Sequence, residues 1–186
     1  MTPAEIHFSV DIETAGPNPS DCALLAIGAC LLDDPGTTYY CELKPDRERF
    51  DPESMQIHKL SRERLESGGT APAEAMAAFA GWIERHTPAN TRPVFVALNA
   101  AFDWMFVNDY FHRYLARNPF GHNALDIKAF YMGFKQLTNF GQAGAALQRD
   151  YPLDHTFRHN ALEDAIDQAK LFARILDDLR DSNASS

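Results

Sequence analysis

Two acidic side chains one residue apart, Asp11 and Glu13, lie in a strand-like segment near the N-terminus and limit what this chain can fold into. Residues 6–12 are rich in apolar side chains, and Gly16-Pro17 closes the segment with a turn signal. Because side chains alternate between the faces of a strand, we expect Asp11 and Glu13 to point one way and Ile12 the other. Two like charges side by side repel each other unless a positive charge lies between them. The simpler explanation is a sheet edge with solvated acids, so the rest of the chain decides.

The composition is that of one globular domain. A length of 186 residues with 45% hydrophobic residues is enough for a substantial core. We expect a single domain over residues 1–181 and a disordered tail over residues 182–186. A formal net charge of -9 argues against a surface built for long nucleic-acid duplexes. It leaves open a locally basic site, or a site where metal ions meet a phosphate.

Cysteine usage and hydropathy indicate the compartment. Cys22, Cys30 and Cys41 form no C-x-x-C pair and fall in strand-like segments, which predicts reduced thiols and a cytoplasmic location. The N-terminus lacks a basic segment followed by an apolar one, and no apolar run approaches the length of a membrane span. We therefore expect a soluble protein without a membrane partner.

The order of the elements predicts an α/β fold. Three strand-like segments come first and should form an antiparallel meander, and the helices come later. A buried strand at residues 94–98 leads into a helix at residues 100–115, which implies a parallel neighbour in the sheet. The meander covers residues 6–12, 22–32 and 39–43; short helical turns follow at residues 52–57 and 62–65, and a helix starts at Pro72. The last helix ends near Leu179 and carries an apolar stripe formed by Leu162, Ala165, Ala169, Phe172, Leu176 and Leu179.

Two of these helices begin with the same pattern, N-A-x-x-D, at Asn99 to Asp103 and at Asn160 to Asp164. An asparagine fits the N-cap position because its side-chain oxygen accepts from free backbone donors of the first turn. Glu163 stands where it would complete a capping box. If both asparagines cap, the two aspartates take equivalent places near a helix start, where the helix dipole favours negative charge. The alternative is that both are ordinary first-turn acids.

His159 directly precedes Asn160 and stands five positions before Asp164. That offset does not suit one face of a continuous helix, but it suits a loop histidine above a helix acid. Such a histidine is placed as a general base must be. The alternative is a surface histidine before a cap, and His155, which lacks this pattern, serves as the comparison.

Three segments in order, VDIET, LNAAFDWMFV and HNALEDA, resemble the three exonuclease motifs of the DEDDh family. That family includes RNase T, oligoribonuclease and the proofreading epsilon subunit of bacterial DNA polymerase III. The resemblance extends to the IGACLL strand and to residues 56–65, so it spans nearly the whole chain. The sister subtype would need tyrosine at position 160, where this chain has Asn160. The resemblance implies a ribonuclease H-like fold, with a five-stranded mixed sheet flanked by helices.

Position by position, the resemblance also implies roles. The metal-binding carboxylates would be Asp11, Glu13, Asp103 and Asp164, with His159 as the general base; Ile12, Thr14, Asn99 and Phe102 would contact the terminal nucleotide. Leu98 departs from the family pattern, because many members have histidine there, and this puts a substrate contact in doubt rather than catalysis. Asp126 matches a recurrent family acid, to which we assign either a structural role or the support of the site residues.

Phosphodiester hydrolysis needs charge neutralisation, a hydroxide near neutral pH and a stabilised leaving oxygen. Two divalent cations can supply all three, and carboxylate oxygens suit Mg²⁺ or Mn²⁺. We therefore expect a metal-dependent 3′-5′ exonuclease that releases nucleoside 5′-monophosphates. The alternatives are an oligoribonuclease-like enzyme for short RNA and a non-catalytic nucleic-acid-binding module. The sequence does not distinguish DNA from RNA, and a homodimer is compatible with it without following from it.

The substrate is expected to be a single-stranded 3′ end. Residues 130–140 interleave Phe130, Phe134 and Phe140 with a lysine, and Lys128 and Arg158 flank them. Aromatic faces can stack unpaired bases while a few cations hold the backbone. The alternative is that these rings fill the core.

Overall fold

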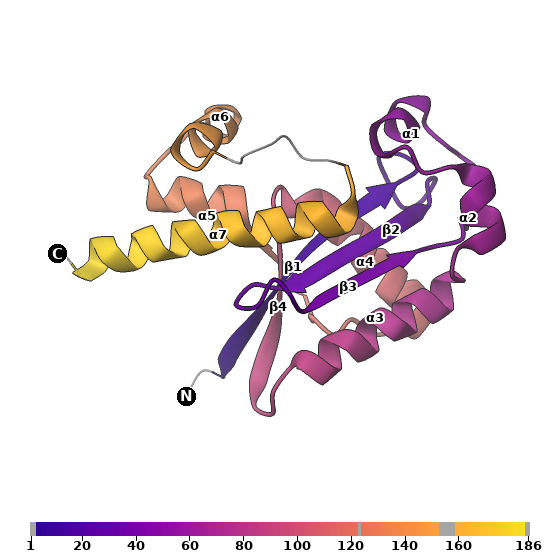
Figure 1. Cartoon of the computed structure of the whole chain (residues 1–186), viewed down its shortest axis with the longest axis horizontal. Coiled ribbons are helices and arrows are strands. Elements are labelled where there is room, and N and C mark those ends of the chain that lie inside the picture. The colour runs from indigo at the N-terminus through magenta and orange to yellow at the C-terminus, as the bar shows by residue number, and fades with distance from the viewer. Residues whose placement is uncertain (1–2, 123, 153–158, 185–186) are drawn as a thin grey trace.

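The computed structural model describes residues 3–122, 124–152 and 159–184. At its centre is a five-stranded sheet in the order β3-β2-β1-β4-β5 (Figure 1). The first three strands pair antiparallel, whereas β4 runs parallel to β1 and β5 runs parallel to β4. The strands are β1 (Ala4–Thr14), β2 (Leu24–Leu31), β3 (Thr38–Glu42), β4 (Thr91–Ala97) and β5 (Ala124–Asp126). The predicted meander, the parallel neighbour and the mixed five-stranded sheet are confirmed.

Helices cover both faces of this sheet. α3 (Pro72–His86) and α4 (Ala100–Leu115) pack on one face, and α7 (Ala161–Ala184) crosses the other (Figure 1). The shorter helices are α1 (Pro52–His58), α2 (Arg62–Gly68), α5 (Ile127–Phe134) and α6 (Phe140–Asp150). Within the described ranges, no helix is both long and apolar enough to cross a membrane.

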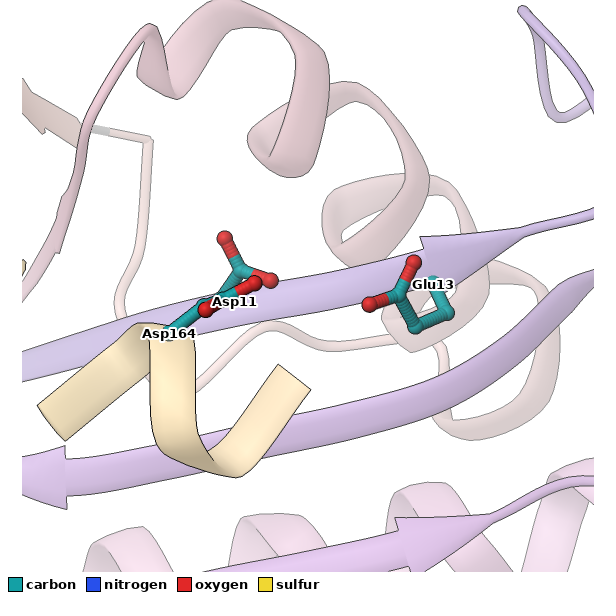
Figure 2. Close-up of side chains that lie close together, drawn as sticks. All are labelled: Asp11, Glu13 and Asp164. Atoms are coloured by element: carbon teal, nitrogen blue, oxygen red, sulfur yellow. The ribbon is translucent and has the colours of Figure 1, made fainter. Parts of the chain in front are cut away.

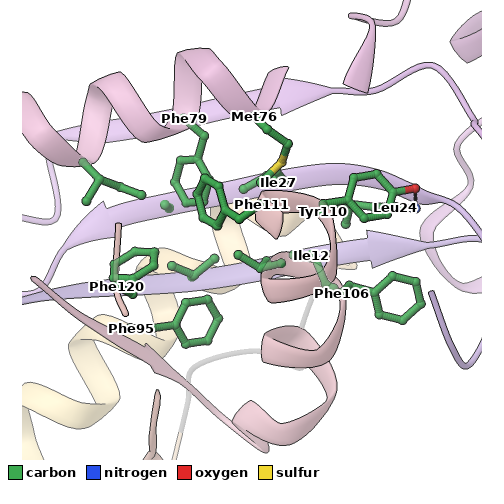
Figure 3. Packing of buried hydrophobic residues seen from close by; sticks show 14 of the residues in the cluster. Ile12, Leu24, Ile27, Met76, Phe79, Phe95, Phe106, Tyr110, Phe111 and Phe120 are labelled. Carbon is green, nitrogen blue, oxygen red and sulfur yellow. Dashed lines mark hydrogen bonds between the residues drawn. The ribbon is translucent and has the colours of Figure 1, made fainter. Parts of the chain in front are cut away.

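The alternation of side chains along β1 separates the core from the site. Phe8, Val10 and Ile12 project into the core under α3 and α4, where Phe79 and Phe111 stack with ring centroids 5.6 Å apart (Figure 3). Burying such a side chain contributes roughly 1.5–3 kcal/mol each. The alternate residues of β1 face α7 instead, which confirms that Asp11 and Glu13 lie on the side opposite to Ile12.

The first turns of α7 lie directly on the strands that carry the site. Gly28 of β2 pairs with Asp11 of β1, and a Cβ atom on Gly28 would lie 2.1 Å from the carbonyl carbon of Ala161. Ser9 Oγ donates to the carbonyl oxygen of Ala165 at 2.8 Å. The missing side chain of Gly28 therefore lets the helix approach, and Ser9 anchors it there.

α7 continues further than the sequence predicts. The apolar stripe ends near Leu179, but the helix runs to Ala184, so the expected tail over residues 182–186 is wrong for its first three residues. A hydroxyl group supports this last turn: Ser182 Oγ donates to the Leu179 carbonyl at 2.9 Å. The last two residues of the expected tail lie outside the described residues.

β5, α5 and α6 are not predicted individually from the sequence; they are short elements of 3, 8 and 11 residues. Each helix has a capping side chain: Asp126 Oδ1 accepts from Ala129 N at 2.7 Å, and Asn139 Oδ1 accepts from Gln142 N at 3.0 Å. α5 packs against α7, where the ring of Phe130 meets that of Phe172 edge-on with centroids 5.1 Å apart.

Candidate active site

Three carboxylates from two distant parts of the chain converge beside the first turn of α7. β1 supplies Asp11 and Glu13, and α7 supplies Asp164 (Figure 2). One carboxylate oxygen from each lies within 4.8 Å of the others. Glu13 and Asp164 are only 8% and 4% exposed, so water screens their charges poorly. We call this set the three-acid group.

Asp103, the fourth predicted ligand, lies in the same cavity but outside the three-acid group. It stands in the first turn of α4 and is 5% exposed. Its carboxylate accepts a hydrogen bond from the backbone of Ile12, beyond the last residue pair that joins β1 to β4. The end of the parallel ladder therefore creates the place that Asp103 fills.

The cavity has a volume of about 390 Å³ and gathers nearly all of the predicted residues. Phe102 is 41% exposed, so it presents an aromatic ring beside the acids. The lining residues are Asp11, Ile12, Glu13, Leu98, Asn99, Phe102, Asp103, His159, Asp164 and Gln168. Carboxylates, a histidine and an open aromatic face together suit a phosphodiester next to a base.

Burial and mutual repulsion disfavour negative charge on these acids. Burial, followed by repulsion from Asp164 and Asp103, raises the pKa of Glu13 to about 8. Burial likewise raises the pKa of Asp103 to about 8, although backbone hydrogen bonds oppose the rise. Asp11 has its pKa raised well above the usual range, by burial and then by the neighbouring acids. A cation in this cavity would remove the repulsion.

His159 lines the cavity next to a fixed helix start. Its backbone lies in the left-handed region, with φ of 54°, which histidine adopts more readily than most residues. Asn160 Oδ1 accepts from the backbone N–H groups of Leu162 and Glu163, both at 3.2 Å, so the predicted cap of α7 is confirmed. The comparison residue His155 lies outside the described residues.

The matching cap expected at Asn99 is wrong. Asn99 has φ of 60°, and its side chain makes no capping hydrogen bond to α4. Asp126 takes over this role because β5 ends beside β4: its Oδ2 accepts from Ala100 N at 2.5 Å while its Oδ1 caps α5. Asp126 therefore joins the starts of two helices, in keeping with a structural role. Asn99 still lines the cavity.

Thr14 is placed differently from the other predicted substrate contacts. It is 6% exposed, and its Oγ1 donates to the Gly16 carbonyl at 2.9 Å rather than lining the cavity. His58 of α1 supports this turn: Leu60 N donates to His58 Nδ1 at 3.1 Å, which leaves Nε2–H to donate to the Thr14 carbonyl at 3.2 Å. Burial lowers the pKa of His58, which favours this neutral form.

Sequence reasoning missed Gln168, which lines the cavity and is 2% exposed. A signal existed, because Gln168 is a polar residue one turn after Asp164, on a face of α7 whose buried residues are mostly apolar. The buried face of α7 is centred on Asp164 and Gln168 rather than on Leu162 and Leu179, which are only partly buried. A count of apolar residues alone therefore predicts a stripe that is rotated around α7 from the face that is actually buried.

The donor set fits hard divalent cations. Carboxylate oxygens are the ligands that Mg²⁺ and Mn²⁺ prefer, and the three-acid group offers three of them in one place. Burial is the first cause of the raised pKa values of both Glu13 and Asp103, because it disfavours the charged form of each carboxylate.

The mixed sheet, the helix that closes over it and the acids at its centre define a nuclease of the ribonuclease H-like fold. Residues 6–176 match the Rv2179c-like 3'-5' exoribonuclease domain, and the chain belongs to this family of 3′-5′ exonucleases. Over 182 residues it is 42% identical to the 3'-5' DNA exonuclease Cap18 of Escherichia coli, covering 96% of this chain and 95% of that protein. It is 30% identical over 178 residues to ribonuclease T of Shewanella sp. (strain ANA-3), covering 90% and 80% of the two chains.

Solved structures agree on the fold. The nuclease domain of 3'hExo, a DEDDh family member bound to rAMP, superposes with a TM-score of 0.75 at 14% identity, covering 94% of this chain and 93% of that one. The E. coli ExoI-ssDNA complex gives a TM-score of 0.69 at 17% identity, covering 96% of this chain and 42% of that one. The predicted DEDDh resemblance and the ribonuclease H-like fold are confirmed, and the chain is a 3′-5′ exonuclease.

Proposed function

We propose that this exonuclease removes nucleotides from the 3′ ends of single-stranded DNA and releases nucleoside 5′-monophosphates. The observation that carries the proposal is the three-acid group, with Glu13 and Asp164 buried, in one cavity with Asp103, His159 and an exposed Phe102. A non-catalytic binding module would have no need to bury several acids that repel one another.

Two divalent cations, Mg²⁺ or Mn²⁺, are the proposed cofactors. Asp11, Glu13 and Asp164 would hold one, and Asp11 with Asp103 would hold the other. When bound, such cations neutralise the phosphate, lower the pKa of a water molecule and stabilise the leaving oxygen. Asp103 suits a second position because it shares the cavity without belonging to the three-acid group.

His159 would supply the remaining chemistry, and Phe102 would hold the terminal base. His159 would accept the proton of the attacking water, since a neutral imidazole can act as a base near physiological pH. It is exposed, lines the cavity and directly precedes the capped start of α7, so its position is tied to that of Asp164. Phe102 would stack on the terminal base, next to Asn99 and the backbone of Ile12. Thr14 would contribute indirectly, because its hydrogen bond to the Gly16 carbonyl holds the turn at the end of β1.

The strand behind the terminal nucleotide would pass over the unit formed by α5 and α6. Residues 127–152 carry Lys128, Lys135 and Arg149 against a single acid, Asp150, in a chain with net charge -9. Phe130 and Phe134 pack against the core, as the alternative explanation held, but Phe140 is 53% exposed. Lys128 Nζ lies 3.8 Å from the Phe140 ring centroid. One ring face beside a cation suits an unpaired base and its phosphate. Arg158 lies outside the described residues.

DNA is preferred over RNA because the relative with 42% identity is a DNA exonuclease, whereas the ribonuclease T proteins share about 30%. RNA is the second candidate, favoured by the exoribonuclease description of the family. Short RNA, the substrate of an oligoribonuclease-like enzyme, would be one form of this second candidate substrate.

The test uses purified protein, Mn²⁺ and labelled single strands of DNA and RNA with the same sequence. We expect mononucleotides from the 3′ end, faster from DNA, with Asp11→Asn inactive. Asp33→Asn, at an exposed loop position, is the matched control and should stay active. Faster release from RNA would favour the second candidate, whereas equal activity of the Asp11→Asn variant would overturn the assigned site.

A single exonuclease domain over residues 1–181 and a cytoplasmic location complete the proposal. The family match over residues 6–176 supports the former. All three cysteines are free thiols, and Cys22 and Cys30 are buried, which is usual for proteins of a reducing compartment.

A further inference from the structure

The parallel ladder between β1 and β4 ends just before the site. Its last residue pair joins Ser9 to Val96, and the same register continued by two residues would place Asp11 opposite Leu98. Instead the chain leaves the sheet after Ala97 and enters α4 through Asn99, whose φ is 60°. A gap therefore opens between Asp11 and Leu98, and a backbone N–H group left unpaired there would be costly.

The side chain of Gln168 closes this gap. Its Oε1 accepts from Leu98 N at 2.8 Å, and its Nε2 donates to Asp11 Oδ1 at 2.6 Å. A primary amide has the same donor and acceptor as a peptide group, so this side chain links the Leu98 backbone to the Asp11 carboxylate just beyond the end of the ladder.

The two contacts also fix which way the amide points. The Leu98 N–H group can only donate, so it selects the oxygen of Gln168 and turns the amino group toward Asp11. The amino group can only donate, so it holds one oxygen of Asp11 as an acceptor. Because Gln168 is 2% exposed, water does not compete for either bond.

We propose that Gln168 is a positioning residue, which sets the orientation of the Asp11 carboxylate and thereby the affinity of the site for its divalent cation. Gln168 lines the cavity, and its amide donates a hydrogen bond to Asp11, a member of the three-acid group, so it would act through that carboxylate. Groups that orient metal-binding side chains in this way typically change metal affinity roughly 10-fold to 100-fold when removed. The inference rests on the proposed metal site.

The experiment measures Mn²⁺ binding to metal-free protein by calorimetry, without substrate, for the wild type and Gln168→Met. Methionine keeps the length and approximate volume of glutamine but makes neither hydrogen bond. We expect the Mn²⁺ dissociation constant to rise roughly 10-fold to 100-fold. At saturating Mn²⁺, kcat on a single strand should fall while KM for the strand changes little. Gln148→Met, at an exposed position of α6, controls for the added methionine.

The outcomes distinguish a failure of the inference about Gln168 from a failure of the proposed metal site. If the wild type binds Mn²⁺ and Gln168→Met binds it equally well, with only a lower melting temperature, Gln168 merely packs and the inference fails. If the wild type binds no Mn²⁺, the proposed metal site itself fails. Should Gln168→Met not fold, Gln168→Asn replaces it: asparagine keeps the amide but is one methylene too short to reach both partners. Unchanged Mn²⁺ affinity in Gln168→Asn would equally overturn the inference.

Discussion

His159 stands directly before the cap of α7, exposed on the cavity wall, while the acids beside it are buried. Because a general base contributes about 100-fold or more to turnover, His159→Ala should lower kcat by at least that factor and leave KM little changed. Steady-state rates on a labelled single strand provide the measurement. His112→Ala, at an exposed position of α4, is the control and should stay active. Equal losses in the two variants would remove His159 from the mechanism.

The raised pKa values of Glu13 and Asp103, both about 8, make the metal-free protein sensitive to pH. In the unfolded chain such groups titrate near pH 4, so between about pH 4 and 8 the folded state binds more protons. The free energy of unfolding should therefore fall as pH rises through this window. Thermal melts in a chelator at a series of pH values measure it.

Substitutions and added metal distinguish the effect of these acids on the pH dependence of unfolding from a general effect of the protein's negative charge. Asp11→Asn should flatten the fall in melting temperature, whereas Asp33→Asn should not. Adding Mn²⁺ near pH 8 should raise the melting temperature of the wild type, because the ion binds the folded state, and the rise should shrink in Asp11→Asn. A wild-type melting curve that ignores millimolar Mn²⁺ would count against the site.

At the scale of elements, the seating of α7 on the sheet brings Asp164 to Asp11. Alanine at Gly28 would place Cβ 2.1 Å from the Ala161 carbonyl carbon and 2.2 Å from Leu162 N, and these are backbone atoms that cannot rotate away. Gly28→Ala should therefore lower the melting temperature and, by moving Asp164, reduce kcat about 10-fold or more, since small displacements of catalytic groups are costly. Melting curves and rates on the same preparations test this.

Gly133→Ala is the matched control, since nothing lies within 4 Å of a Cβ atom there and alanine favours a helix. It should leave activity unchanged and the melting temperature equal or higher. A folded Gly28→Ala variant with full activity would show that the site tolerates a displaced α7.

A separate prediction concerns the unit formed by α5 and α6. If an upstream base stacks on Phe140, Phe140→Ala should raise KM for a strand of several nucleotides by about 5-fold or more, the lower end for base stacking of roughly 1 kcal/mol. A dinucleotide, too short to reach it, should be unaffected. Ile57→Ala removes a similarly exposed apolar side chain, 49% against 53%, and should change neither KM. Equal KM values for wild type and Phe140→Ala on the longer strand would place the strand elsewhere.

For the whole molecule, a net charge of -9 with few local cations favours short contacts with single strands. Two phosphate contacts, from Lys128 and Lys135, correspond to a slope of about -1.4 when the logarithm of affinity is plotted against that of salt concentration. We expect such a shallow slope, slower attack on a blunt duplex than on a single strand, and little attack on a 3′-phosphorylated end. A faster reaction on the blunt duplex would contradict this reading.

The sequence by itself determined the features that depend on local spacing. The period of two along β1 put Asp11 and Glu13 on one face, and the apolar pattern with its flanking residues predicted α4 at the bounds it has, Ala100–Leu115. Three motifs in order were enough to indicate the family, because each keeps its chemistry within a few residues.

Only the tertiary structure decided which residues that are distant in the sequence contact one another at the site. It assigned the start of α4 to Asp126 instead of Asn99, set Asp103 apart from the three-acid group and joined Gln168 to both Asp11 and Leu98. No local pattern specifies these contacts, because they depend on where β4 leaves the sheet and how closely α7 approaches Gly28. Spacing along the chain sets which face a side chain takes, but packing between elements sets which partner it meets.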